Sequence, residues 1–118
     1  MSRQASADAE RRLPAYGPSK AALEALSAIV AKDLDGTGVT VNVLVPGGIT
    51  NTPMISDEAG FDRATMIQPE VMVPPLLWLV SDAAAKVTGR RFLGVHWDPT
   101  LSPEEAARQL AELKRQLL

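Results

Sequence analysis

The order of three segments along the chain limits most strongly what it can fold into. The first is a predicted helix from about Tyr16 to Asp35, ended by Gly36-Thr37-Gly38. The second is a predicted buried strand, Val39–Val45, rich in β-branched residues, and the third is the breaker Pro46-Gly47-Gly48. A helix, a strand and a glycine loop in this order are typical of open α/β sheets, which bind ligands at the carboxyl ends of their strands.

Two helices have an apolar pattern that predicts burial. The stripe on the first predicted helix consists of Ala22, Leu26, Ile29, Val30 and Leu34. Pro69 begins a second helix that runs to about Val80, although Pro74-Pro75 must kink or restart it. Its end, residues 76–80, is apolar all round, so we expect this segment to be deeply buried.

The remaining segments predict a second strand and a final helix. A short helix from Ser81 to Lys86 precedes a strand over Arg91–His96. Ser102-Pro103-Glu104-Glu105 is a capping box with proline at the first helical position, and the helix it begins, residues 103–118, should bury Ala106, Leu110, Leu113 and Leu117. The fold class predicted is therefore α/β, with two parallel strands joined by a right-handed helical crossover.

Tyr16 and Lys20 are the candidate catalytic pair. Four residues apart on a helix, they share one face, roughly 5–6 Å apart at Cβ. An ammonium beside a phenol favours the phenolate, which suits the phenol to general acid–base catalysis. Because a lone Y-x-x-x-K also occurs on ordinary solvated helix faces, the segments that follow it carry much of the interpretation.

Three of these segments together resemble one protein family. YGPSKAALEAL, VTVNVLVPGGITNTPM and LLWLVSDAAAKVTGRRF, which cover about Tyr16 to Phe92, are similar to the C-terminal half of a short-chain dehydrogenase/reductase. The resemblance implies part of a Rossmann-like, doubly wound parallel sheet. It also implies an enzyme that moves hydride between NAD or NADP and an alcohol or ketone.

The resemblance also implies roles for individual residues. Tyr16 would donate or accept the proton, and Lys20 would hold the nicotinamide ribose and favour ionised Tyr16. Thr52 matches a loop threonine that contacts the cofactor's carboxamide or a phosphate oxygen. The other residues expected to line the nicotinamide pocket are Pro46, Gly47 and Ile49.

Several features of the family are missing from the sequence. The eight glycines never form G-x-G-x-x-G, so we expect no phosphate loop and no activity from this chain alone. The family's catalytic serine precedes its tyrosine; Ser2 lies slightly beyond the usual spacing and Ser6 slightly short of it. Ser2 is the better candidate, although a polar residue in a flexible N-terminal segment, residues 1–13, is the simpler interpretation.

Residues 53–68 correspond to the family's mobile substrate lid. Its apolar contacts would be Met54, Ile55, Phe61 and Met66. The alternative is an ordinary surface loop. His96, the only histidine, fits a polar residue at a strand end or a subunit contact better than a catalytic base. Arg90-Arg91 fits a solvated strand edge better than a phosphate-binding pair.

Length and composition limit the partners. At 118 residues the chain is at most one domain, which we expect to be partial: a fragment, a mis-assigned start or one half of a split protein. A net charge of −2 gives no attraction to nucleic acid or a membrane surface, and no apolar run suits a signal peptide or a membrane span. The absence of cysteine fits a cytoplasmic protein and excludes cysteine-ligated zinc; no metal site is predicted.

Two functions therefore compete. The first is an NAD(P)-dependent oxidoreductase of the short-chain type, assembled as a homo-oligomer or with a partner chain that supplies the missing N-terminal half. The second is a non-catalytic remnant that binds a related full-length chain.

Overall fold

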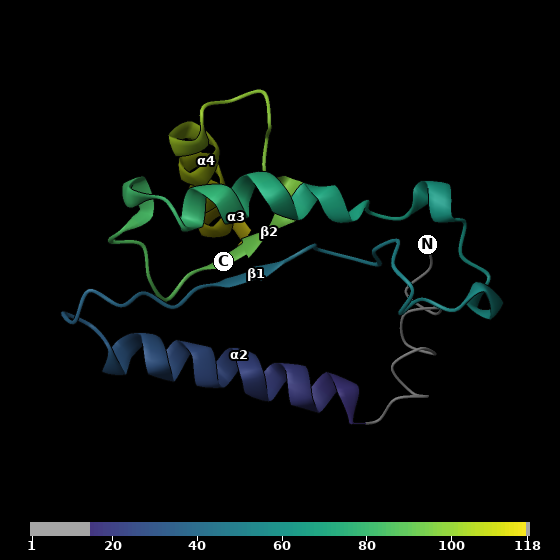
Figure 1. Cartoon of the computed structure of the whole chain (residues 1–118), viewed down its shortest axis with the longest axis horizontal. Coiled ribbons are helices and arrows are strands. Elements are labelled where there is room, and N and C mark those ends of the chain that lie inside the picture. The colour runs from purple at the N-terminus through teal and green to yellow at the C-terminus, as the bar shows by residue number, and fades with distance from the viewer. Residues whose placement is uncertain (1–14, 118) are drawn as a thin grey trace.

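The computed structural model describes residues 15–117 (Figure 1). The first helix is α2, Tyr16–Asp33, followed by strand β1, Val43–Val45. Helix α3, Val73–Leu79, leads to strand β2, Arg91–Leu93, and helix α4 spans Pro103–Leu117. Short 3₁₀ helices lie between these elements: η1 Asp57–Ala59, η2 Arg63–Thr65, η3 Pro69–Met72, η4 Asp82–Ala84 and η5 Gly94–His96. The predicted flexible segment 1–13 lies outside the described residues.

The two strands form a parallel sheet, which confirms the α/β class. Val43 pairs with Arg91 and Val45 with Leu93. The connection between the strands passes through α3. In Figure 1, α2 lies on one side of the strands, and α3 and α4 lie on the other. Helices therefore flank the small sheet on both sides, as parallel strands require.

The first strand is shorter than the predicted Val39–Val45 because side chains replace part of the ladder. The Asn42 side chain donates to the Val87 carbonyl at 2.8 Å and accepts from the Arg90 amide at 3.2 Å. The Thr88 hydroxyl accepts from the Val41 amide at 3.0 Å. The extended chain before Val43 is thus tied to the segment before β2 largely through side chains, and regular pairing begins only at Val43.

The second strand was also predicted too long, because Arg91–His96 ends as a strand at Leu93. The chain then turns into η5, where the Val95 amide donates to the Pro46 carbonyl at 3.0 Å. Gly94 is buried, and a Cβ there would stand 3.2 Å from the Val71 carbonyl oxygen. The turn therefore lets η3 pack closely against the end of β2.

The core lies between α3, β2 and α4. Trp97, Ala106 and Ala107 are buried together, with Trp78, Leu101 and Leu110 packed against them. The Trp78 ring lies edge-on to Phe92, 6.4 Å between centroids, and tilted against Trp97 at 6.0 Å. These large aromatic surfaces dominate the apolar area removed from water.

The predicted burial of the two apolar helices is wrong for much of their surface. On α2 the stripe residues Leu26 and Ile29 are 56% and 57% exposed, and Ala31 is the buried residue. On α3, Leu77 is 63% exposed, and Val80, directly after the helix, is 73% exposed. The described residues cover only the sides of α3 that carry Pro75 and Trp78, so its remaining apolar surface faces outward.

Proline and serine mark the helix starts as predicted. Pro69 opens η3, and α3 then begins just before Pro74-Pro75, which is the restart expected there. The Ser102 hydroxyl accepts from the Glu105 amide at 3.3 Å at the start of α4. In α4, Ala106 is fully buried and Leu110 half-buried, whereas the side chains of Leu113 and Leu117 lie outside what the structure describes.

Candidate functional site

Tyr16 and Lys20 lie in the first turns of α2. Lys20 Nζ stands over the Tyr16 ring, 5.6 Å from its centroid, which is a cation–π contact. Both side chains are exposed, Tyr16 by 40%. The i, i+4 spacing thus brings the two candidate catalytic groups together, and neither side chain is buried in the core.

The glycine loop after β1 is tightly bound by its neighbours. Gly47 has a φ of +106°, and a Cβ there would stand 2.6 Å from Val95 Cγ1. A Cβ on Gly48 would be 3.0 Å from Ile67 Cδ1. Only glycine fits Gly47 without strain, so the loop that carries the predicted pocket residues Pro46, Gly47 and Ile49 has a fixed path.

The chain after this loop is paired with residues 67–68. The Ile67 amide donates to the Ile49 carbonyl at 3.0 Å, and the Asn51 amide donates to the Ile67 carbonyl at 2.8 Å. Asn51 Nδ2 donates to Gln68 Oε1 at 3.2 Å. The candidate cofactor segment, Ile49 to Thr52, is therefore fastened to the end of the predicted lid.

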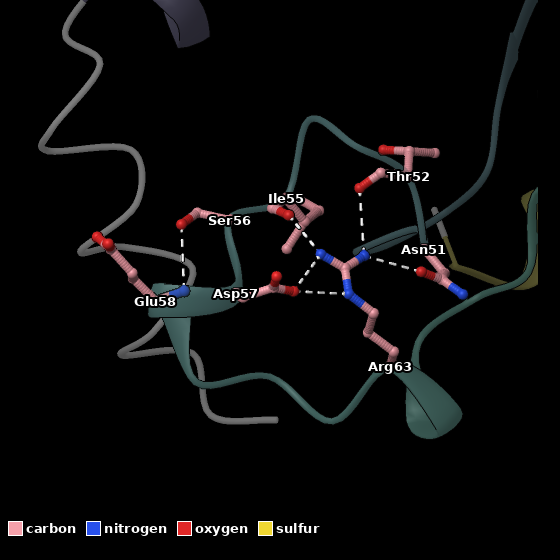
Figure 2. A network of polar contacts seen from close by, with 7 residues as sticks. All are labelled: Asn51, Thr52, Ile55, Ser56, Asp57, Glu58 and Arg63. Atoms are coloured by element: carbon pink, nitrogen blue, oxygen red, sulfur yellow. Dashed lines mark hydrogen bonds and ion pairs between the residues drawn. The ribbon is translucent and has the colours of Figure 1, made fainter.

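Arg63 holds the next part of the loop (Figure 2). Its guanidinium donates to Asp57 Oδ1, to Asn51 Oδ1 and to the carbonyls of Thr52 and Ile55, at 2.7 to 3.3 Å. No regular spacing in the sequence links Arg63 to Asn51 or Thr52, so Arg63 was missed as a site residue. Its one signal is that of a lone arginine within a polar loop.

The two parts of the site lie at the same end of the molecule. In Figure 1, α2 and β1 run in opposite directions, so the N-terminal end of α2 is at the same end as the carboxyl end of β1. Tyr16 and Lys20 are in contact with each other. The predicted pocket residues, Pro46, Gly47, Ile49 and Thr52, all lie in the loop that follows β1. Among the described residues, no hydrogen bond or ion pair joins the tyrosine–lysine pair to that loop.

Other residues singled out from the sequence have varied surroundings. Of the predicted lid contacts, Met66 is buried, Ile55 and Phe61 are half-buried, and Met54 is 63% exposed. His96 is exposed in η5 rather than at a strand end, and Arg91 forms an exposed ion pair with Glu24 at 3.1 Å. Ser2 and Ser6 lie outside the described residues.

The carboxyl group of Asp98 has a lowered pKa. The Thr100 hydroxyl donates to Asp98 Oδ1 at 2.6 Å and the Thr100 amide at 2.9 Å. These two bonds, the hydroxyl's first, hold the pKa of Asp98 below its ordinary value. Asp98 lies after β2 and is structural, since it caps its own turn.

Within residues 15–117, no cluster of three or more histidine, cysteine, aspartate or glutamate side chains could hold a metal ion. No helix in the same part of the chain has the length and apolar character needed to cross a membrane.

Comparisons with known proteins agree with the arrangement of motifs. A family model described as Enoyl-(Acyl carrier protein) reductase matches residues 1–93. The rhamnolipids biosynthesis 3-oxoacyl-(acyl-carrier-protein) reductase of Pseudomonas aeruginosa is 39% identical over 85 residues, covering 64% of this chain and 33% of that protein.

Two other relatives give the same result. The 2-(S)-hydroxypropyl-CoM dehydrogenase 3 of Xanthobacter autotrophicus is 33% identical, over 68% of this chain and 37% of that protein. The 2,3-dihydro-2,3-dihydroxybenzoate dehydrogenase of Escherichia coli is 34% identical, over 64% of this chain and 38% of that protein. No solved structure matches the chain significantly.

The chain spans a little over a third of the length of these relatives at most. The family model extends over more than half of the chain, through β1, α3 and β2. By its motifs, its parallel sheet and these similarities, the chain belongs to the short-chain dehydrogenase/reductase family.

Proposed function

We propose that this chain supplies the proton-transfer and nicotinamide-side part of an oxidoreductase that moves hydride between NAD or NADP and an alcohol or ketone. The observation that carries the proposal is the contact of Lys20 with Tyr16 in the first turns of α2, at the same end of the molecule as the carboxyl end of β1. The relatives' printed names, which are those of reductases and dehydrogenases, support the same reaction class.

The donor groups of the site fit a nicotinamide nucleotide. Among the described residues, the Tyr16 hydroxyl, Lys20 Nζ and Thr52 Oγ take part in no hydrogen bond. A phenol, an ammonium and a hydroxyl are the groups needed to bind ribose hydroxyls and a carboxamide. The proposal places the sheet in a larger Rossmann-like, doubly wound fold, whose cofactors bind at the carboxyl ends of the strands.

In this mechanism the chain's own residues handle the proton. The bound cofactor supplies or accepts the hydride. Tyr16 gives its hydroxyl proton to the substrate oxygen during reduction and takes it back during oxidation. Lys20 binds the ribose and stabilises negative charge on Tyr16, while Thr52 orients the nicotinamide end. The three side chains would thus speed the reaction by acid–base catalysis and by holding the reactants close together, and both effects need the side chains to be accurately placed.

The proposal includes a partner for the exposed apolar surfaces of α2 and α3. Leu23, Leu26 and Ile29 are each more than half exposed on α2, and Leu77 and Val80 are similarly exposed at α3. Apolar surface of this kind usually marks an interface. We assign it to a second copy of the chain or to the polypeptide that corresponds to the rest of the relatives' length. A cytoplasmic location stays a prediction.

The test uses the complete gene product that carries this chain. Purified protein is mixed with NADH or NADPH and a panel of ketones and aldehydes, and with NAD or NADP and the matching alcohols. Absorbance of the reduced nicotinamide reports hydride transfer in both directions. Transfer with at least one substrate pair is expected. The proposal would be contradicted if the protein transferred no hydride and bound neither nucleotide.

A further inference from the structure

Arg63 stands where the candidate cofactor loop meets the segment that follows it. Its side chain projects from η2 into the turn made by residues 51–57, and its partners surround it in Figure 2. Nη1 donates to Asn51 Oδ1 at 2.8 Å and to the Thr52 carbonyl at 3.3 Å. Nη2 donates to the Ile55 carbonyl at 2.7 Å. One side chain thus gathers three separate points of the loop.

A guanidinium is required for this set of contacts. All three of its nitrogens are used, because Nε and Nη2 also donate to Asp57 Oδ1 at 3.0 and 2.8 Å. The donors of arginine lie in one plane and point outward like a fork, whereas lysine offers donors from a single nitrogen. Lysine at position 63 would keep the charge and lose most of the contacts.

The two sides of the Arg63 network differ in exposure. The Asp57 side chain is 90% exposed, and an ion pair open to water contributes little to stability. The bonds to Asn51, Thr52 and Ile55 are partly buried. A carbonyl that is withdrawn from water and loses its donor is costly. The inner bonds, rather than the ion pair, therefore hold the loop.

Few other interactions hold residues 52–60 in place. Within this segment the amides of Ile55, Ala59 and Gly60 donate to the carbonyls of Thr52, Ser56 and Asp57, and the Ser56 hydroxyl accepts from the Glu58 amide. All four are local contacts between residues two or three apart. Between residues 15 and 117, Arg63 is the side chain whose hydrogen bonds link this segment to the strand-like residues 49–51, through Asn51, which in turn donates to Gln68.

We propose that Arg63 is a positioning residue for the cofactor site. By binding the Thr52 carbonyl and the Asn51 side chain, it fixes the backbone from which the Thr52 hydroxyl projects. By binding the Ile55 carbonyl, it keeps the first half of the lid folded against that backbone. The inference rests on the proposed function for the role of Thr52, but the closure of the loop by Arg63 is independent of it.

The test compares four variants of the complete gene product. Arg63→Gln removes the fork, Arg63→Lys keeps only the charge, and Asp57→Asn weakens only the exposed ion pair. Arg91→Gln is the matched control, because Arg91 has a similar exposure and one ion-pair partner, Glu24, outside the loop. Amide hydrogen exchange of residues 52–60 is measured without cofactor, and exchange of α2 reports whether the fold is intact.

We expect Arg63→Gln and Arg63→Lys to speed exchange of residues 52–60 about tenfold, a free-energy change of about 1.4 kcal/mol. Asp57→Asn should change it only a few-fold and Arg91→Gln not at all. The same two Arg63 variants should raise the KM for the cofactor about tenfold, while kcat at saturating cofactor changes little. Substitution of a residue that served only stability would leave the ratio of kcat to the cofactor KM unchanged in the folded protein.

The outcomes separate the two claims. If wild-type protein transfers no hydride and binds no nucleotide, the proposed function fails, and the exchange rates still decide whether Arg63 closes the loop. If exchange rises but the cofactor KM does not, the positioning role is overturned. If Arg63→Lys behaves like wild type in both measurements, charge suffices and the inference is overturned as well.

Discussion

The ammonium of Lys20 lies over the ring of Tyr16, 5.6 Å from its centroid, across one turn of α2. The contact orders two side chains that are otherwise exposed to solvent. In the proposed reaction Tyr16 exchanges its proton with the substrate, and Lys20 stands ready to bind the ribose beside it.

Lys20→Met should weaken both cofactor binding and turnover. The substitution removes the charged donor to the ribose, so we expect cofactor affinity to fall about tenfold, equivalent to about 1.4 kcal/mol, and turnover to fall with it. Lys32→Met is the control, since Lys32 is an exposed lysine in the last turn of the same helix. Calorimetric titration and steady-state kinetics measure both; equal affinities for the two variants would argue against a role for Lys20.

The glycines of the chain should differ sharply in their tolerance of alanine. At Gly47 a Cβ meets Val95 Cγ1 at 2.6 Å and φ is +106°, so Gly47→Ala combines overpacking with backbone strain and should cost about 2–3 kcal/mol. Gly36 also has a positive φ, +78°, but open space around it, so Gly36→Ala should cost about 1 kcal/mol.

Chemical denaturation gives the free energy of unfolding of each glycine variant. Gly17 serves as the internal reference, because it is helical and has no atom within 4 Å of a Cβ. Gly17→Ala should stabilise the protein by about 0.5–1 kcal/mol. Equal costs at Gly47 and Gly36 would mean that the contact with Val95 is not close in solution.

The exposed apolar surfaces should make the 118-residue chain self-associate. Val73, Leu76, Leu77 and Val80 follow an i, i+3, i+4, i+7 pattern and are each at least half exposed. Leu77→Lys should lower the apparent mass measured by light scattering at micromolar concentration. Gln109→Lys, an equal charge change at an exposed polar position of α4, should not. A wild-type chain that stays monomeric would contradict the assignment of these surfaces to a second copy of the chain.

Asp98 gives a pH dependence whose sign can be worked out. Its folded-state pKa is lowered, first by the Thr100 hydroxyl and then by the Thr100 amide. The stabilisation is therefore present above the ordinary pKa of an aspartate and is lost as the pH falls through the lowered value. Thr100→Val removes the hydroxyl bond and should move the Asp98 pKa back upward.

An NMR titration of the Asp98 carboxyl carbon measures this shift directly. Thr37→Val is the control, because the Thr37 hydroxyl donates to the Leu34 carbonyl rather than to a carboxylate. An unchanged Asp98 titration in Thr100→Val would show that the hydroxyl bond contributes nothing in solution.

Local backbone chemistry was the part of the fold that the sequence predicted well. Proline set the start of η3 and the restart at α3, Ser102 capped α4, and the glycine loop ended β1. These features depend on residues next to one another in the chain, so a pattern contains all the information needed. The pairing of Tyr16 with Lys20 belongs to the same class, since helix spacing fixes it.

The parts that were missed depend on residues distant in the chain. Asn42 and Thr88 replaced ladder bonds, which shortened the first strand, and neither residue has a distinctive spacing. The apolar run 76–80 predicted burial, but a pattern does not say whether another segment covers it. Arg63 was missed because its partners are selected by the path of an irregular loop.

The most direct test of the central claim is turnover of Tyr16→Phe in the complete gene product, measured together with cofactor affinity. The substitution removes one hydroxyl and keeps the ring under Lys20. We predict that cofactor binding stays within about twofold, a change of less than about 0.5 kcal/mol, while turnover falls by about 10²–10⁴-fold, the usual contribution of a general acid–base group. Turnover above about a tenth of wild type would contradict Tyr16 as the proton donor.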